Sequence, residues 1–344
     1  MKRSINAKLK HACLVLVFCC TAAVAESEQQ FASLGDLPLE SGEILQDVRI
    51  GYRIAGTLNA DKSNIIVFPT WFSGSTGNLI QYGLVGPGLL ADTGRYYVIV
   101  IDSLANGVSS SPSNSQKQAG AGFPGISIDD MVTSQHLLLT QHLGIEHVRA
   151  VMGVSMGGMQ AFQWMGQYPG FMDKAIPIDG SPRMTSYDLL QFQTHLQVIE
   201  MLQAAAVSNR EITRHLASLN MLTLWTPDYF VENIPREKLP QMISESEQGY
   251  ARLDANDYAA QLRAMIGHDV YAQDTAGQPG YAESVRADVL VVGVAQDHMV
   301  NPIPGKKLAA TLNARHLEVQ SNCGHIGSSC ESASVIAAVH AFLE

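Results

Sequence analysis

Short apolar runs alternate with helix-like stretches over the first half of the chain. Continuous apolar runs of this kind are typical of strands buried on both faces, and spacing of three to four residues is typical of helices. The pattern predicts strands at 48–55, 64–68, 97–101, 148–153 and 174–178, with helices at 127–143 and 156–168 between the last three. Alternating strands and helices indicate an α/β fold with a mainly parallel, doubly wound sheet.

The strand signals stop for about a hundred residues and then return. Residues 188–207, 211–224 and 239–265 have helical spacing, with a break near Gly249. Strand patterns resume at 288–294 and 315–320, with helices at 302–312 and 332–343. The layout predicts an α/β core made of residues 26–180 and 288–344, with a helical cap, 181–287, inserted between its halves.

The first 25 residues have the layout of a secretory signal peptide. Lys2, Arg3, Lys8 and Lys10 precede an apolar run at 12–20, and 23–25 reads Ala-Val-Ala. The apolar run is too short to span a bilayer, so we expect no stable membrane insertion. The pattern predicts cleavage after Ala25 and a periplasmic or secreted protein. The alternative is an uncleaved membrane anchor.

Composition narrows the range of partners. Hydrophobic residues make up 46% of the chain and charged residues 16%, as in a globular protein with a large core. Loss of the four basic leader residues would lower the formal net charge from −10 to −14, which disfavours nucleic acid as a partner. The sequence holds no zinc-binding pattern and no phosphate-binding glycine loop, so we expect no metal and no cofactor.

Two cysteines, Cys323 and Cys330, would remain in the mature chain. In an oxidising compartment a pair seven residues apart can close a short disulfide loop. Two free thiols are the alternative if the protein stays in a reducing compartment.

The segment Gly153-Val154-Ser155-Met156-Gly157 carries the strongest chemical signal. It joins a predicted buried strand to a predicted helix. This turn holds a serine in a strained conformation and exposes its hydroxyl at the carboxyl edge of the sheet, while the glycines relieve crowding. Ser155 is therefore predicted to be a catalytic nucleophile, with an ordinary turn serine as the alternative.

A nucleophilic serine needs a base and an acid, which follow it in this order: serine, acid, histidine. Asp297 lies just beyond the strand at 288–294, and His325 lies just beyond the strand at 315–320. His316 and His340 also come late, but within a predicted strand and helix. Asp297 could instead be a carboxylate that caps a turn.

The oxyanion of the tetrahedral intermediate needs two backbone N–H donors. Met156, the residue after the nucleophile, is one predicted donor. The other should lie in the loop after the strand at 64–68, with Phe72 the first choice and Trp71 the next.

The chain resembles the homoserine O-acetyltransferase family of α/β-hydrolase-fold proteins. The likeness spans nearly the whole mature chain and is strongest at 122–132 and 153–160, with further family stretches at 168–169, 253–258 and 296–297. The resemblance implies a triad of Ser155, Asp297 and His325. It also implies a cap that forms an active-site tunnel, and often a homodimer made through cap helices.

Departures from the family shift the functional prediction. Family acetyltransferases carry an aspartate for the substrate amine directly after the catalytic histidine, whereas this chain has Ile326, which cannot accept a charge-assisted hydrogen bond. Arg214 is a loose match to the cap arginine that binds the substrate carboxylate, and a solvated helix arginine is the alternative. Gly267-His268-Asp269 precedes the Asp297 strand, so it cannot be the triad loop.

Three functions follow from these features. The prediction is an exported serine hydrolase that cleaves a small ester or related acyl compound through a Ser155 acyl-enzyme. The first alternative is an acyltransferase that passes the acyl group to an alcohol or amine. The second is a non-catalytic binding protein on the same fold.

Overall fold

The structure is a computed structural model that describes residues 28–272, 274 and 279–344. The predicted signal peptide and its cleavage site after Ala25 lie outside the described residues.

An eight-stranded sheet forms the centre of the molecule, in the order β1-β2-β6-β3-β7-β8-β9-β10. The pairs from β6 to β10 are parallel, whereas β1 and β2 pair antiparallel with each other and β2 pairs antiparallel with β6. The mainly parallel sheet agrees with the sequence pattern. Its strands are β1 (Gln30–Pro38), β2 (Ile44–Ala55), β3 (Ile65–Pro69), β6 (Tyr97–Ile101), β7 (Val148–Val154), β8 (Met172–Ile178), β9 (Asp288–Val294) and β10 (Arg315–Val319), and β4 (Val85–Gly86) pairs separately with β5 (Ala91–Asp92).

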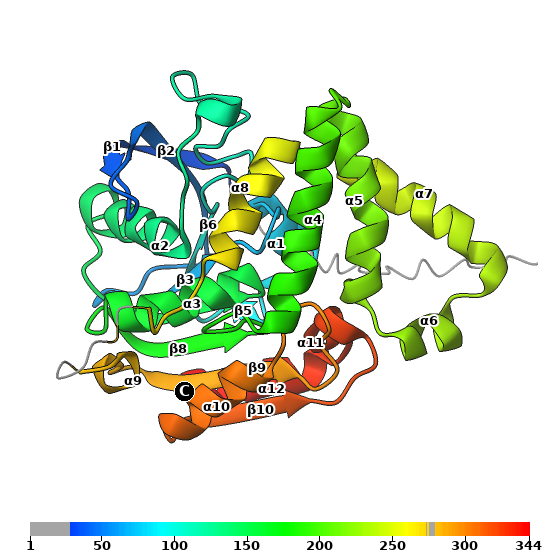
Figure 1. The fold of residues 1–344 in the computed structure, drawn as a ribbon. Coiled ribbons are helices and arrows are strands. Elements are labelled where there is room, and N and C mark those ends of the chain that lie inside the picture. Colours follow the sequence, from blue (N-terminus) through cyan, green and yellow to red (C-terminus); the bar gives the residue numbers. More distant parts are fainter. Residues whose placement is uncertain (1–27, 273, 275–278) are drawn as a thin grey trace, which may run out of the picture.

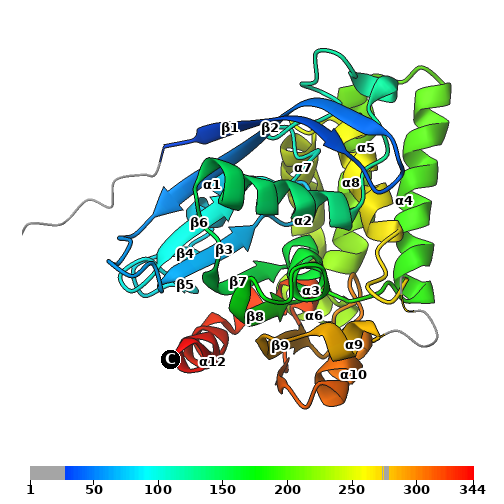
Figure 2. The ribbon, with the colours of Figure 1, turned by 90° about the vertical axis from the view of Figure 1, so that its left-hand side faces the viewer.

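Helices cover both faces of the sheet (Figures 1 and 2). Alternate residues of β3 face different helices: Ile65 and Val67 join the core formed with α2, α3 and α10, whereas Ile66 and Phe68 join the core formed with α1 and α12. This double burial explains the continuous apolar runs. The bounds of these helices are α1 (Thr76–Gln81), α2 (Ile128–Leu137, continued by a π-helical turn, Leu138–His142), α3 (Met156–Gln167), α10 (Ile303–Thr311), α11 (Gly327–Cys330) and α12 (Ser332–Leu343).

Between β8 and β9 the chain leaves the sheet and forms a set of helices that lie beyond its carboxyl edge (Figure 1). The bounds are α4 (Ser186–Ala204), α5 (Asn209–Leu224), α6 (Pro227–Asn233), α7 (Leu239–Tyr250), α8 (Ala255–Ile266) and α9 (Tyr281–Ser284). Helices α6 and α7 project furthest from the sheet. In contrast, α9 packs on the core helix α3, where the Tyr281 hydroxyl donates to the Phe162 carbonyl.

A helix that crosses a membrane must be both long and apolar. Within residues 28–272, 274 and 279–344, no single helix is long and apolar enough to cross a bilayer. The consecutive segments Gly324–Cys330 and Ser332–Leu343, bent by 71° relative to each other, meet the length and composition criteria only as a pair.

Candidate active site

Ser155 lies on a sharp turn between β7 and α3. Its backbone has φ 58° and ψ −122°, a strained conformation for a residue with a side chain. Its N–H donates to the carbonyl of Ile178 at the end of β8, at 2.9 Å, which fixes the turn against the neighbouring strand. The local chain therefore presents the serine at the carboxyl edge of the sheet, where the sequence predicted it.

The glycines around Ser155 are required by close backbone contacts. A Cβ on Gly153 would collide with the carbonyl of Gly157, and one on Gly157 would lie 2.7 Å from the carbonyl oxygen of Pro69. A Cβ on Gly158 would lie 2.7 Å from the carbonyl oxygen of Ile178. Helix α3 can approach the ends of β3 and β8 only because these positions lack side chains.

The structure brings Ser155, His325 and Asp297 together in one hydrogen-bonded chain. The Ser155 Oγ lies 2.8 Å from His325 Nε2, and His325 Nδ1 lies 2.7 Å from Asp297 Oδ2. All three residues are at most 9% exposed. The arrangement can deprotonate the serine hydroxyl and stabilise the imidazolium that results. His316 and His340 lie elsewhere, on β10 and α12.

Asp297 serves both of the roles considered for it. Its Oδ1 accepts hydrogen bonds from the N–H groups of Met299 and Val300, at 2.8 and 2.9 Å, while Oδ2 faces His325. The turn-capping contacts fix the carboxylate in the orientation that holds the imidazole.

His325 stands on a loop closed by the disulfide between Cys323 and Cys330. Burial alone would lower the pKa of His325, but the charge of Asp297 and its hydrogen bond outweigh burial and raise the pKa above its usual value. The imidazole is thus a stronger base than a free histidine side chain, which suits proton abstraction from Ser155.

Of the two predicted oxyanion donors, Met156 directly follows the serine and Phe72 lies on the loop after β3. Among the residues that the structure describes, no group accepts a hydrogen bond from the backbone N–H of Met156 or of Phe72. Phe72 also lines the cavity beside Ser155. Among the described residues, the N–H of Trp71, the second choice, also has no hydrogen-bond acceptor, and its ring packs against Tyr82 at 6.1 Å between centroids.

Two buried glutamines, which the sequence did not single out, hold the loop after β3. Gln160 on α3 donates to the carbonyls of Thr70 and Met156, at 3.0 and 3.1 Å. Gln261 on α8 accepts from the N–H of Ser73 at 2.7 Å and donates to the carbonyl of Leu104 at 2.9 Å. The sequence signal that could have identified Gln261 is a single polar residue among alanine and leucine, at 259–262.

The cavity at Ser155 is small and largely apolar. It measures about 10 Å³, the room of a single water molecule. From the cap, His195, Asn220 and Tyr258 line it with side chains that carry polar groups. Burial lowers the pKa of His195 to about 4, so that its imidazole is neutral near pH 7. Besides Ser155 and His195, the cavity is lined by Phe72, Phe192, Asn220, Tyr258, Met265, Met299 and Val300.

Arg214 is not brought into this cavity. Its guanidinium lies 3.2 Å from Glu211 on the same helix and 2.8 Å from Glu247 on α7, and its side chain is 41% exposed. The structure therefore agrees with the solvated helix arginine and gives no support to a substrate contact.

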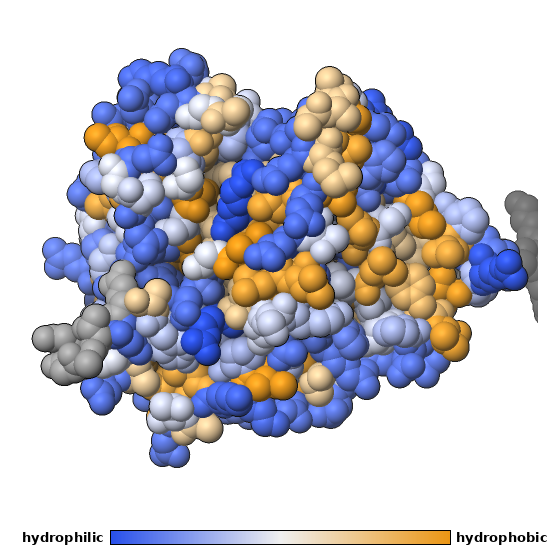
Figure 3. Space-filling view, viewed as in Figure 1, coloured by the Kyte–Doolittle hydropathy of each residue, from blue (hydrophilic) through white to orange (hydrophobic). Residues whose placement is uncertain are grey.

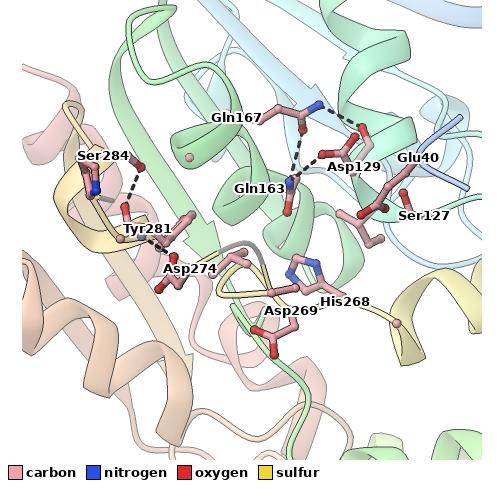
Figure 4. A pocket seen from close by; sticks show the side chains of 17 residues that line it. Glu40, Ser127, Asp129, Gln163, Gln167, His268, Asp269, Asp274, Tyr281 and Ser284 are labelled. Atoms are coloured by element: carbon pink, nitrogen blue, oxygen red, sulfur yellow. Dashed lines mark hydrogen bonds between the residues drawn. The ribbon is translucent and has the colours of Figure 1, made fainter. Parts of the chain in front are cut away.

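A second hollow, of about 270 Å³, lies away from the triad (Figure 4). His268 and Asp269 line it together with Asp129 and Gln163. Burial lowers the pKa of His268 to about 4. This placement agrees with the expectation that 267–269 is not the triad loop. Among the described residues, no cluster of three or more His, Cys, Asp or Glu side chains could hold a metal ion.

Comparisons with known proteins agree with this geometry. Residues 64–329 match the α/β hydrolase fold family. An ethyl acetate hydrolase from Pseudomonas veronii is 35% identical over 210 residues, which cover 58% of this chain and only 60% of that relative. A homoserine O-acetyltransferase from Chlorobaculum parvum is 31% identical over 314 residues, covering 83% of this chain and 88% of the relative.

The solved structure of an acetylester hydrolase from Corynebacterium glutamicum superposes with a TM-score of 0.84 at 26% identity, covering 92% of this chain and 95% of that one. The chain is an enzyme with serine hydrolase or acyltransferase activity, so the non-catalytic alternative is set aside. The chain belongs to the α/β hydrolase fold family and is related within it to esterases and homoserine O-acetyltransferases.

Proposed function

We propose that this protein is an esterase that hydrolyses esters of small acyl groups through an acyl-enzyme on Ser155. The observation that carries the proposal is the small, largely apolar cavity at Ser155, which leaves no room for a long acyl chain. The names of the ethyl acetate hydrolase and acetylester hydrolase relatives support the same substrate class.

In the proposed reaction, Ser155 Oγ attacks the acyl carbonyl carbon while its proton passes to His325 Nε2. The N–H groups of Met156 and Phe72 bind the oxyanion. As the tetrahedral intermediate collapses, His325 gives its proton to the departing alkoxide. Water, deprotonated by His325, then attacks the acyl-enzyme. The bond between the acyl carbon and Ser155 Oγ breaks, His325 returns the proton to Ser155, and the acid leaves.

Transfer to an alcohol or amine is the second candidate, because the Chlorobaculum parvum homoserine O-acetyltransferase matches most of the chain. Ile326 favours water as the acceptor, since its side chain offers no group that could bind the amine of homoserine.

Turnover of 4-nitrophenyl acetate, butyrate and octanoate, with and without added homoserine, tests the proposal. We expect kcat/KM to fall at least about tenfold from acetate to octanoate, because each longer chain must displace packed side chains. Free acetate should be the main product, and Ser155→Ala should abolish turnover while the far-ultraviolet circular dichroism stays unchanged. Equal rates on octanoate, or O-acetylhomoserine as the main product, would contradict the proposal.

We also propose that the protein is exported to the periplasm or secreted. The basic and apolar leader and the Cys323–Cys330 disulfide support export, because disulfides persist mainly in oxidising compartments. Amino-terminal sequencing of the full chain expressed in its natural host should begin at Glu26. A start at Met1 in the cytoplasmic fraction would contradict export.

A further inference from the structure

A buried carboxyl group outside the triad lies at the same edge of the sheet. Asp179 directly follows β8, and its backbone has φ 49°, a conformation that non-glycine residues rarely adopt. Its N–H donates to the carbonyl of Val292 at 2.9 Å, and the residue is only 2% exposed. The preceding carbonyl, that of Ile178, holds the N–H of Ser155. Asp179 is thus one residue away from the contact that fixes the nucleophile.

The partners of Asp179 connect it to the loop of the catalytic base. Ser328, three residues after His325 and inside the disulfide-closed loop, donates its hydroxyl to Asp179 Oδ2. The other oxygen, Oδ1, is buried and has no hydrogen-bond partner among the described residues. A buried carboxyl with an unpaired oxygen destabilises a fold, and an asparagine could accept the Ser328 hydrogen bond without burying an ionisable group. The tether alone therefore does not explain an aspartate here.

Three carboxyl groups interact electrostatically with the His325 imidazole. Asp297 follows β9, Asp179 follows β8 and Asp188 lies on α4. Burial raises the pKa of Asp179 to about 7, the charge of His325 opposes that rise, and the charge of Asp297 adds to it. The protonation of Asp179 is thus linked to that of the imidazole in the pH range where an esterase works.

We propose that Asp179 is a positioning residue for the reaction at Ser155: it anchors the His325 loop through Ser328, and its negative charge strengthens His325 as a base. When His325 takes the serine proton, the imidazolium favours release of a proton from Asp179 to solvent. The resulting carboxylate adds to Asp297 in stabilising the imidazolium. The inference rests on the proposed serine chemistry but is the same for hydrolysis and for transfer.

The substitution Asp179→Asn tests the charge and keeps the acceptor for Ser328. The measured quantity is the second-order rate of fluorophosphonate labelling of Ser155 from pH 5 to 9, which reports the state of His325 even if no tested ester is turned over. We expect the acidic limb of the profile to shift down by about half a pH unit or more, because the imidazole loses a nearby negative charge. The labelling rate near pH 8 should fall several-fold.

Thermal stability gives a second, independent readout. The pKa of Asp179 is about 7 in the folded protein, above its value in the unfolded chain, so its burial costs stability as pH rises from about 4 to about 7. Asp179→Asn removes this cost. The difference in Tm between the variant and the unsubstituted protein should therefore increase, in favour of the variant, as the pH is raised from 5 to 8. Substitution of a residue that only tethers the loop would leave the labelling profile in place.

Ser328→Ala is the matched control, because it removes the tether and keeps the Asp179 carboxyl group. It should lower the labelling rate and shift the acidic limb less than Asp179→Asn does. The proposal is overturned if Asp179→Asn leaves the limb unmoved, or if it shifts no further than Ser328→Ala does. Absence of ester turnover together with a shifted labelling profile would instead count against the proposed function alone.

Discussion

At the scale of single residues, the site depends on where side chains are absent as much as on where they are present. Gly157 lets α3, which begins with the predicted oxyanion donor Met156, approach the end of β3 and the loop that carries the other predicted donor, Phe72. The contact is between backbone atoms, which cannot move aside as the end of a flexible side chain could.

Replacing Gly157 by alanine should therefore impair both stability and chemistry. The added Cβ would lie 2.7 Å from the carbonyl oxygen of Pro69, so α3 and the β3 loop must separate. We expect a loss of about 1–3 kcal/mol in the free energy of unfolding and at least a tenfold fall in kcat. Urea denaturation and turnover of 4-nitrophenyl acetate measure the two effects.

Gly125→Ala is the matched control for this substitution. Gly125 is exposed, and a Cβ there meets no atom within 4 Å. Its stability and turnover should stay close to those of the unsubstituted protein. An unimpaired Gly157→Ala variant would show that the close approach at the turn is not needed.

At the scale of helices and strands, the sequence predicts those elements that leave a local pattern of apolar residues. The parallel strands and α3 were recognisable because burial on both sheet faces leaves continuous apolar runs. Strand β1 was missed because it is an edge strand whose register is irregular between Ser33 and Leu37. In the whole strand, only Ala32 and Leu37 are buried hydrophobic residues.

The catalytic candidates could also be predicted, because each follows a strand of the sheet at its carboxyl end. The residues that support the catalytic candidates through hydrogen bonds could not be predicted. Gln261 and Asp179 acquire their contacts from segments 188 and 149 residues away in the chain, to Ser73 and Ser328. No periodicity reports such pairings, nor the ion pair of Arg214 with Glu247.

At the scale of the whole molecule, apolar side chains gather on the cap (Figure 3). Leu190 on α4, Leu222 on α5 and Val231 on α6 are 66%, 74% and 86% exposed. Exposed apolar groups of this kind are typical of interaction surfaces. The homodimer through cap helices stays a prediction, and this surface is where we expect it.

Light scattering at micromolar concentration should therefore give about twice the mass of one chain. Leu222→Asp should shift the protein toward the monomer, because a charge would be buried without a partner. Ile44→Asp, at an exposed position on β2, is the control and should leave the mass unchanged. A monomer under all conditions would contradict the prediction.

The disulfide beside His325 has a consequence for when the enzyme becomes active. A thiol reductant opens the loop that places the imidazole, and Cys330 is exposed to such a reductant. In a chain still inside a reducing cytoplasm, His325 would lie on an open loop. Such a chain would not hydrolyse the acetyl esters of the cell that makes it. We expect fluorophosphonate labelling to slow when dithiothreitol is added and to recover on reoxidation, whereas an unchanged rate would contradict this dependence. Delivery to an oxidising space and maturation of the active site would then be one event.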